Sequence, residues 1–324
     1  KGFQLVNFGV EPLSPEAIVD GAIMDAGLVI EAIQRVFTNN KIRTNDVAIS
    51  LSGHSVIIKK ISLPSMNTEE LAESIQWEAE QYIPFDVDDV NIDYQVLQAP
   101  QNPGEGNMDV LLVAVKKDKI NDLTSVISQA GKSAAVADVD VFALQNAFEA
   151  SYEPAHGKVI ALVNVGASVT NIAIINDGTS IFWRDISVGG NNHTDALQKE
   201  LGISFDQAEA AKRGENSDLP QDRVMSVIDA VNEQVGAEIQ KTLDFFKATS
   251  ASDPVSRIHL TGGASQTPNL MSYLGRRVDT NVELMNPFRG IQINERAFPP
   301  EKIEPMAQAA TVAVGLALRN AGDR

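Results

Sequence analysis

The sequence predicts an α/β fold, and three of its features lead to this prediction. Short runs rich in β-branched residues alternate with longer segments of helical periodicity along the chain. The 324 residues are 44% hydrophobic and 21% charged, which is ordinary for a globular protein that buries a large core. Cysteine is absent, so disulfides, thiolate metal sites and cysteine nucleophiles are excluded.

Charge and hydropathy argue against nucleic acid and lipid as direct partners. The formal net charge is -17, and no basic face is concentrated enough to attract a phosphate backbone. The longest apolar runs, at residues 159–163 and 111–115, are far shorter than the roughly 20 residues that span a bilayer. The four histidines are dispersed, so we expect no metal site held by the protein alone.

The first part of the chain predicts one α/β layer followed by a more separable unit. We expect a strand over 3–10, a helix over 14–37 that starts at Ser14 and Pro15, and strands over 47–51 and 56–63. Pro64 then breaks the pattern. The separable unit is expected to contain a helix from Thr68 to about residue 82, strands over 90–97 and 108–115, and a helix over 118–129.

From residue 159 the strand pattern restarts. We expect strands over 159–165, 169–175 and 180–187, helices through most of 191–249, and strands over 257–260 and 282–284. The last helix is expected over 305–319. Its small apolar residues suit close packing between two domains.

The turn between the first two of these strands has the composition of a phosphate-binding loop. Gly166, Ala167 and Ser168 can point several backbone amides at one place, as a phosphate requires. An ordinary glycine-containing hairpin is the alternative.

Two further motifs are compatible with a nucleoside. Gly262 and Gly263 end a strand and open a helix, where close approach and the helix dipole favour an anion, although a simple turn has the same composition. Glu209, Lys212 and Arg213 share one face of a predicted helix and could hydrogen-bond a ribose and stack on a base. A solvated, salt-bridged face is the alternative.

The order of these motifs resembles the superfamily of actin, the heat-shock chaperones and the sugar kinases. The run 187–191, which contains Gly189 and Gly190, resembles the division protein FtsA, and the Glu209 helix resembles the adenosine-contacting helix of the chaperones. Within the superfamily, residues 74–85, 138–146 and 164–170 resemble the PilM family of type IV pilus assembly proteins. This resemblance covers essentially the whole chain.

The resemblance implies an actin-like fold, with two ribonuclease-H-like domains around a nucleotide cleft that holds ATP and Mg²⁺. The first domain would comprise 1–63, 132–158 and 305–324, the second 159–304, and a small inserted α+β subdomain 64–131. Family members carry a first phosphate loop before the strand that opens this sequence, so we expect that loop and its strand to be missing here.

The resemblance also implies partners. PilM-like proteins bind the cytoplasmic tail of the membrane protein PilN, and Trp77, Tyr82, Ile83 and Phe85 are the candidates for that contact. Core packing under the subdomain is their alternative role. Other pilus platform proteins and motor ATPases are expected partners, and self-association is left open. No amphipathic or basic helix follows Arg319, so we expect a cytoplasmic protein that reaches the inner membrane through its partners.

Two residues bear on catalysis. Asn164 stands where actin and the chaperones place an aspartate near Mg²⁺ and the attacking water, and a neutral amide holds metal more weakly. Gln145 aligns with the superfamily glutamine that orients this water, or is simply a polar residue on a connecting helix. We therefore expect ATP to be bound, with slow or absent hydrolysis.

These inferences predict a nucleotide-binding scaffold of the type IV pilus inner-membrane platform that relays its state to the pilus motor. One alternative is a small-molecule kinase of the same superfamily, for which Asp138 or Asp140 would be the catalytic carboxylate. Another is the cytoplasmic domain of a type II secretion platform protein.

Overall fold

The computed structural model describes residues 2–100, 106–153, 156–215, 218–250 and 252–323, and the chain forms two compact units. The first unit comprises Lys1–Gly9, Asp20–Ala22 and Asp140–Arg319, and the second comprises Val10–Val19, Ile23–Val139 and Asn320–Arg324. The division into two domains and an inserted subdomain stays a prediction.

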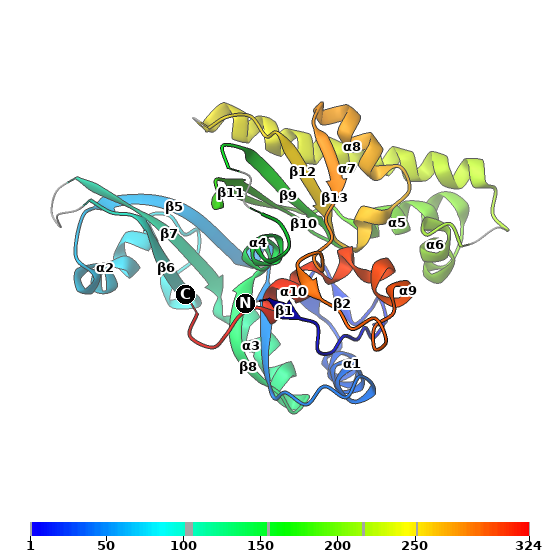
Figure 1. The fold of residues 1–324 in the computed structure, drawn as a ribbon, viewed down its shortest axis with the longest axis horizontal. Helices are drawn as coiled ribbons and strands as arrows, with labels where there is room; N and C mark the ends of the chain where they lie inside the picture. The colour runs from blue at the N-terminus through cyan, green and yellow to red at the C-terminus, as the bar shows by residue number, and fades with distance from the viewer. Residues whose placement is uncertain (1, 101–105, 154–155, 216–217, 251, 324) are drawn as a thin grey trace. The chain divides into compact units, whose positions relative to one another are not determined.

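A five-stranded sheet forms the centre of the first unit (Figure 1). In spatial order its strands are β11 (Thr179–Ile186), β10 (Thr170–Asn176), β9 (Val159–Val165), β12 (Arg257–Thr261) and β13 (Asn281–Leu284). β10 is antiparallel to β9 and β11, whereas β12 is parallel to β9 and β13. Every residue of β9 is buried, which explains its continuous apolar sequence, because a strand covered on both faces has no solvent side.

Helices cover both faces of this sheet. The helices of the first unit are α4 (Asp140–Ser151), α5 (Gly190–Leu201), α6 (Phe205–Lys212), α7 (Gln221–Thr249), α8 (Leu270–Val278), α9 (Pro300–Ile303) and α10 (Thr311–Ala317). Of these, α4, α7 and α8 pack directly on the strands. Val235 and Ile239 of α7 and Leu274 of α8 pack into the core that β9, β10 and β12 share. Among the described residues, no helix has both the length and the apolarity that crossing a bilayer requires.

Helix α4 contacts two other segments of the first unit backbone to backbone. A Cβ placed on Gly315 of α10 would lie 1.7 Å from the carbonyl oxygen of Ala143, and one on Gly290 would lie 2.1 Å from that of Ala150. The expected helix over 305–319 is therefore close-packed, as its small residues indicate, but its predicted length is wrong. The 3-10 turns Glu304–Met306 and Gln308–Ala310 replace its first half, where Pro305 supplies no amide hydrogen.

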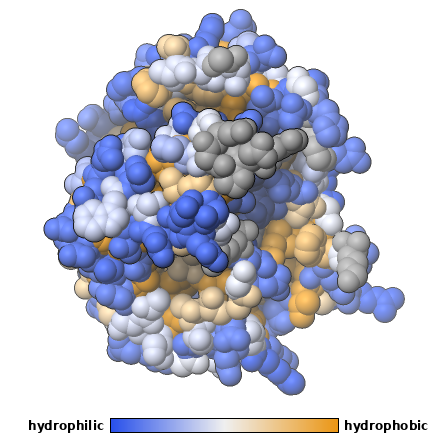
Figure 2. All heavy atoms as spheres, turned by 90° about the vertical axis from the view of Figure 1, so that its left-hand side faces the viewer, coloured by the Kyte–Doolittle hydropathy of each residue, from blue (hydrophilic) through white to orange (hydrophobic). Residues whose placement is uncertain are grey.

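The second unit contains two small sheets. One is antiparallel, with the spatial order β5 (Val56–Pro64), β7 (Asn107–Lys116) and β6 (Val90–Gln98), and the other pairs β4 (Asp46–Leu51) in parallel with β8 (Ser133–Val139). Helices α1 (Ala26–Asn39), α2 (Thr68–Glu80) and α3 (Lys117–Gln129) belong to this unit. Figure 2 shows that one face of the molecule is mainly hydrophilic, with hydrophobic residues gathered in patches.

Helix α2 packs on the three-stranded sheet through its buried residues Leu71, Ile75 and Ala79. The helix starts at Thr68, as expected, and its cap is the preceding residue, Asn67. The Asn67 side chain accepts a hydrogen bond from the amide of Glu70, and the Glu70 carboxylate accepts one from the amide of Asn67. This capping box satisfies two amides that would otherwise lack partners at the helix start.

The expected helix over 14–37 is wrong in its first half. β2 (Ile18–Val19) and β3 (Ala22–Ile23) form a hairpin there, joined by Asp20 and Gly21 with φ values of 48° and 75°. A two-residue turn of this handedness suits an Asp-Gly pair and ends helical geometry. α1 starts only after Asp25, whose carboxylate accepts from the amide of Leu28 at 3.0 Å.

The expected strand over 3–10 is much shorter than predicted. Only β1 (Phe3–Gln4) pairs, in parallel with β14 (Ile291–Gln292), and both belong to the first unit. An extended segment forms a strand only where a neighbouring strand supplies hydrogen bonds. Among the described residues, the neighbour of β1 is β14, which is only two residues long.

Candidate functional site

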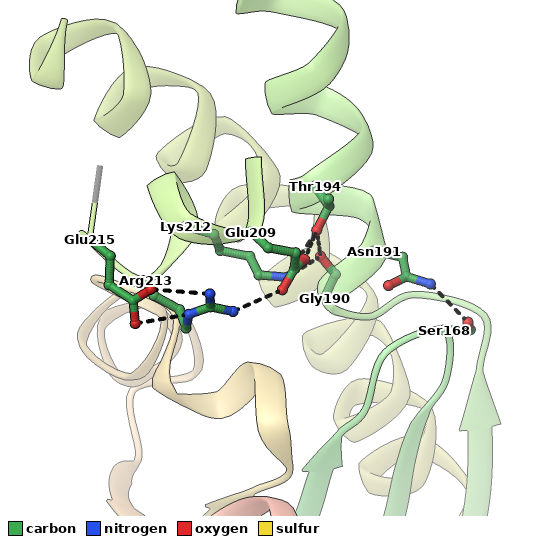
Figure 3. A network of polar contacts seen from close by, with 8 residues as sticks. All are labelled: Ser168, Gly190, Asn191, Thr194, Glu209, Lys212, Arg213 and Glu215. Carbon is green, nitrogen blue, oxygen red and sulfur yellow. Dashed lines mark hydrogen bonds and ion pairs between the residues drawn. The ribbon is translucent and has the colours of Figure 1, made fainter. Parts of the chain in front are cut away.

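The turn at Gly166 lies at the carboxyl end of β9 and supports the start of α5. The amide of Gly166 closes the turn on the carbonyl of Val169 at 3.0 Å. The carbonyls of Gly166 and Ala167 accept hydrogen bonds from the amides of Gly190 (2.9 Å) and Asn191 (2.8 Å). The Asn191 side chain also donates to the Ser168 hydroxyl at 3.3 Å (Figure 3). The phosphate-loop candidate and the Gly189–Gly190 candidate thus form one structure.

Gly190 is the point where three candidate segments meet. A Cβ placed on it would lie 3.0 Å from the Ala264 side chain, 3.5 Å from Nζ of Lys212 and 3.6 Å from the carbonyl of Gly166. A Cβ on Gly189 would lie 2.5 Å from the carbonyl oxygen of Ala167, which no real side chain tolerates. These glycines allow the three segments to converge.

Gly262, at the end of β12, brings two further backbone segments into close contact. Its φ is +92°, and a Cβ there would lie 2.3 Å from the carbonyl oxygen of Val165 and 2.7 Å from Oδ1 of Asn164. Its amide donates to the carbonyl of Gln308 at 3.1 Å. The neighbouring parallel strands β9 and β12 therefore end in contact, and Gly262 is required there for both conformation and space.

A compact polar network lies beside Gly190 (Figure 3). Nζ of Lys212 donates to Oε1 of Glu209 (2.5 Å), to the Thr194 hydroxyl (2.9 Å) and to the Gly190 carbonyl (3.3 Å). The Thr194 hydroxyl donates to the same carboxylate. Only 12% of the Lys212 side chain and 22% of that of Glu209 are exposed, so this is a shielded pair rather than a solvated helix face.

The network fixes the charge of Glu209. Burial alone would raise the pKa of its carboxyl, but the hydrogen bonds from Lys212 and Thr194 and the positive charges of Lys212 and Arg213 outweigh burial and leave this pKa below its ordinary value. Arg213 lies at the edge, with Nη1 3.6 Å from Oε2 of Glu209. Its guanidinium binds Glu215 through two hydrogen bonds, which raise the pKa of Arg213.

Thr194 is a site residue that sequence reasoning does not single out. It lies four residues after Gly190, on the same face of α5, so its hydroxyl points at the side chains of α6 (Figure 3). The available signal is the spacing of a hydroxyl one turn after a glycine pair. This signal is weak because threonines on helices usually bond their own backbone, as Thr194 also does to Gly190.

The two catalytic candidates lie apart. Asn164 is buried at the end of β9, next to Gly262. The Gln145 side chain donates to Glu149 at 2.6 Å and to the carbonyl of Gly178 at 3.3 Å, and Gly178 follows the far end of β10. Because a seven-residue strand spans about 20 Å, the structure does not bring Gln145 to the Gly166 turn.

The four partner candidates of the second unit differ in exposure. Ile83 is buried in the core beneath α2, and Tyr82 and Phe85 pack against this core while half-buried. Trp77 lies on α2 with 72% of its surface exposed. Of the four candidates, Trp77 is therefore the one whose side chain is most accessible to a partner.

The site offers donors for an anion. Among the described residues, the amides of Ala167 and Ser168 have no hydrogen-bond partner, whereas those of Gly166, Gly189 and Gly190 are used within the loops. Two free amides at the tip of a turn, next to a helix N-terminus and a shielded lysine, fit a phosphate group.

The fold is that of the actin-like ATPases, as the sequence predicts. The structure of MreB5 of Spiroplasma citri bound to ADP is similar over 93% of this chain and 77% of its own, with a TM-score of 0.51 at 12% identity. At this identity the likeness concerns the fold alone.

Residues 1–321 match the family described as type IV pilus assembly protein PilM, and the chain belongs to this family. The structure of a PilM-PilN type IV pilus biogenesis complex is similar with a TM-score of 0.84 and 26% identity, over 95% of this chain and 89% of the other. The resemblance inferred from residues 74–85, 138–146 and 164–170 is therefore confirmed at the level of the family.

Proposed function

We propose that this chain is a nucleotide-binding scaffold of the type IV pilus inner-membrane platform. It binds ATP with Mg²⁺ at the loops around Gly190, holds the cytoplasmic tail of PilN, and relays its state to other platform proteins and the pilus motor. It works at the cytoplasmic face of the inner membrane and reaches the membrane through PilN. The observation that carries the proposal is the convergence of the Gly166 turn, the Gly262 turn and the Glu209–Lys212 pair at Gly190.

ATP suits this arrangement in two parts. The free amides of Ala167 and Ser168 hold a phosphate, and the Glu209 carboxylate accepts from, and the Lys212 ammonium donates to, the hydroxyls of a ribose. Both charges are already paired, so the ligand competes with an existing ion pair rather than meeting two isolated buried charges.

Turnover is slow or absent in this proposal. Phosphoryl transfer depends on positioning water and metal against the γ-phosphate. Asn164 is neutral and its amide nitrogen is engaged by Asn171 at 2.7 Å, which leaves a single carbonyl oxygen. Gln145 is directed to Gly178 instead. The site therefore favours binding over hydrolysis.

The nucleotide claim is tested by titrating the protein with a fluorescent ATP analogue in the presence of Mg²⁺. Lys212→Gln should weaken binding at least tenfold, because a shielded charge-assisted donor is lost. Lys241→Gln is the matched control, since Lys241 also pairs with a glutamate three residues earlier, Glu238, but on an exposed face of α7. Equal affinity in both variants, with folding intact by circular dichroism, would reject the Gly190 site.

The PilN claim rests on family membership, on the similar PilM-PilN complex and on the exposed Trp77. Calorimetric titration with a synthetic PilN N-terminal tail peptide, with and without Mg·ATP, tests it. Trp77→Ala should weaken saturable 1:1 binding, whereas Phe245→Ala, which removes an aromatic ring that is 50% exposed in the first unit, should not. No binding by the unmodified protein under either condition would sink the scaffold proposal.

A further inference from the structure

A second candidate binding site lies at the opposite end of the same strands. The loops around Gly190 follow the last residues of β9 and β12, whereas a cavity of about 480 Å³ opens where these two strands begin. Lys158, Ile160, Arg257 and His259 contribute to its lining, and all of its lining residues belong to the first unit. Cavities of this volume are typical of small-molecule sites. The length of β9 separates the two sites by about 20 Å.

The interior of the cavity is aromatic. The rings of Phe148 and Tyr152 are stacked with centroids 5.0 Å apart and an interplanar angle of 6°. The His259 ring lies 4.9 Å from Phe148 and 5.1 Å from Tyr152. Burial lowers the pKa of His259 to about 4, so this ring is uncharged near neutral pH and adds to an apolar wall.

The rim of the cavity carries two cations that lack acidic partners. Arg257 is paired with Glu283: its Nη1 donates to both carboxylate oxygens of Glu283, at 3.3 Å and 3.4 Å. Neither Lys158 nor Arg289 has a carboxylate within ion-pair distance among the described residues. The carboxylate of Glu153 also lines the cavity, so three cations (Lys158, Arg257 and Arg289) stand against two carboxylates (Glu153 and Glu283). In a chain of net charge -17, this local excess of positive charge favours an anion.

Two further contacts in the cavity bear on anion binding. The Arg289 guanidinium lies over the Tyr152 ring, 5.0 Å from its centroid, so the aromatic face orients it while its N–H edge stays available. In addition, Nδ1 of buried His259 makes no hydrogen bond, although Oε1 of Glu283 lies 3.2 Å away. A buried polar atom without a partner is uncommon, and His259 is one of the residues that line the cavity.

We propose that this cavity binds a small organic anion. Arg289 and Lys158 hold its carboxylate or phosphate group, and its apolar body packs against Phe148, Tyr152 and Ile160. The arginine fork suits either group, since both present two oxygens to it. The aromatic wall excludes a fully hydrated inorganic ion as the preferred occupant, because such an ion gains nothing from apolar contact.

The probe is 1-anilinonaphthalene-8-sulfonate, a fluorescent organic anion with an apolar body, titrated into the full chain at neutral pH. Benzoate and phenyl phosphate are then used as competitors, and their relative strength separates a carboxylate ligand from a phosphate ligand. Arg276→Gln is the matched control, since the Arg276 guanidinium also lies over a tyrosine ring, that of Tyr273 at 5.7 Å, and its residue is likewise exposed.

We expect saturable 1:1 probe binding that weakens about tenfold or more in Arg289→Gln and in Lys158→Gln but not in Arg276→Gln. Arg289→Lys, which keeps the charge and loses the fork, should fall between the unmodified protein and Arg289→Gln. Each variant is checked by thermal unfolding, and Lys158 is exposed, so its variant should fold normally. Equal probe affinity in Arg289→Gln, Lys158→Gln and Arg276→Gln, or no displacement by either competitor, would overturn the proposal.

Discussion

Nδ2 of Asn164 donates a 2.7 Å hydrogen bond to Oδ1 of Asn171 across the β9–β10 pair. Asn171 in turn donates to Asp185 of β11 at 2.9 Å. Because the Asp185 carboxylate can only accept, the direction of both bonds is set, and Oδ1 of Asn164 is turned toward Gly262. The orientation of a candidate catalytic side chain is thus imposed from the far edge of the sheet.

Replacing Asn171 with leucine should destabilise the protein by about 1–3 kcal/mol, since the Asn164 amide would be left buried without an acceptor. Urea unfolding measures this change. Asn176→Ala, at the half-exposed far end of the same strand, should stay within about 0.5 kcal/mol of the unmodified protein. Equal stabilities for the two variants would mean that the chain of amides does not hold the strand ends.

Gly262→Ala should cost clearly more than Gly178→Ala. Both residues have positive φ, +92° and +78°, so each substitution adds backbone strain of about 1–2 kcal/mol. Only Gly262 also places the new methyl 2.3 Å from a carbonyl oxygen, whereas Gly178 has no atom within 4 Å. Thermal unfolding of the two variants compares them, and similar melting temperatures would show that the strand ends separate easily.

His259 should make the protein less stable as pH falls below neutrality. Its pKa in the folded protein is about 4, below the unfolded value of 6.5, so its contribution is complete above pH 6.5 and is lost as pH falls toward 4. Between pH 7 and pH 5 the loss is about 2 kcal/mol by linkage. His259→Gln should remove this part of the pH dependence. The separate contribution of His193, whose pKa is also lowered by burial, should remain in this variant.

An NMR titration checks the same point directly. The ring proton resonances of His259 should titrate well below pH 6.5, near pH 4. A midpoint at or above 6.5 would mean that Glu283, 3.2 Å away, stabilises the charged ring more than burial penalises it.

Trp77→Ala and Ile83→Ala should separate docking from packing. Ile83 is 5% exposed in the core beneath α2, so truncation should cost about 2–5 kcal/mol. Trp77 is 72% exposed, so its truncation should change stability by less than about 0.5 kcal/mol. Urea unfolding of both variants gives the comparison. A large loss of stability in Trp77→Ala would assign this residue to packing instead.

Sequence reasoning succeeds where local pattern and burial agree. The strand over 159–165 is confirmed with the same bounds because all seven of its residues are buried. It fails at residues 14–25, where an Asp-Gly turn interrupts a segment whose composition also suits a helix. Glu209 and Lys212 could be paired from their spacing. The place of Gly190 between three segments, however, depends on contacts with Lys212, Gly166 and Ala264, which lie 22, 24 and 74 residues away in sequence.

Gln145 shows the limit of reasoning from resemblance. The resemblance aligns it with the superfamily glutamine that orients the attacking water, whereas in the structure its side chain donates to the carbonyl of Gly178. Side-chain direction depends on where the helix lies over the sheet, and the sequence of the helix alone does not fix that position.

The two glycines that meet α4 contact it at Ala143 and Ala150, seven residues or two helical turns apart and about 10 Å along the axis. Since residues seven apart lie on the same side of a helix, α4 is clamped along one edge at both ends. With no side chains between the clamped backbones, the helix cannot slide along its axis by even one residue without a collision. A displacement of α4 along its axis therefore requires the segments around Gly290 and Gly315 to move with it.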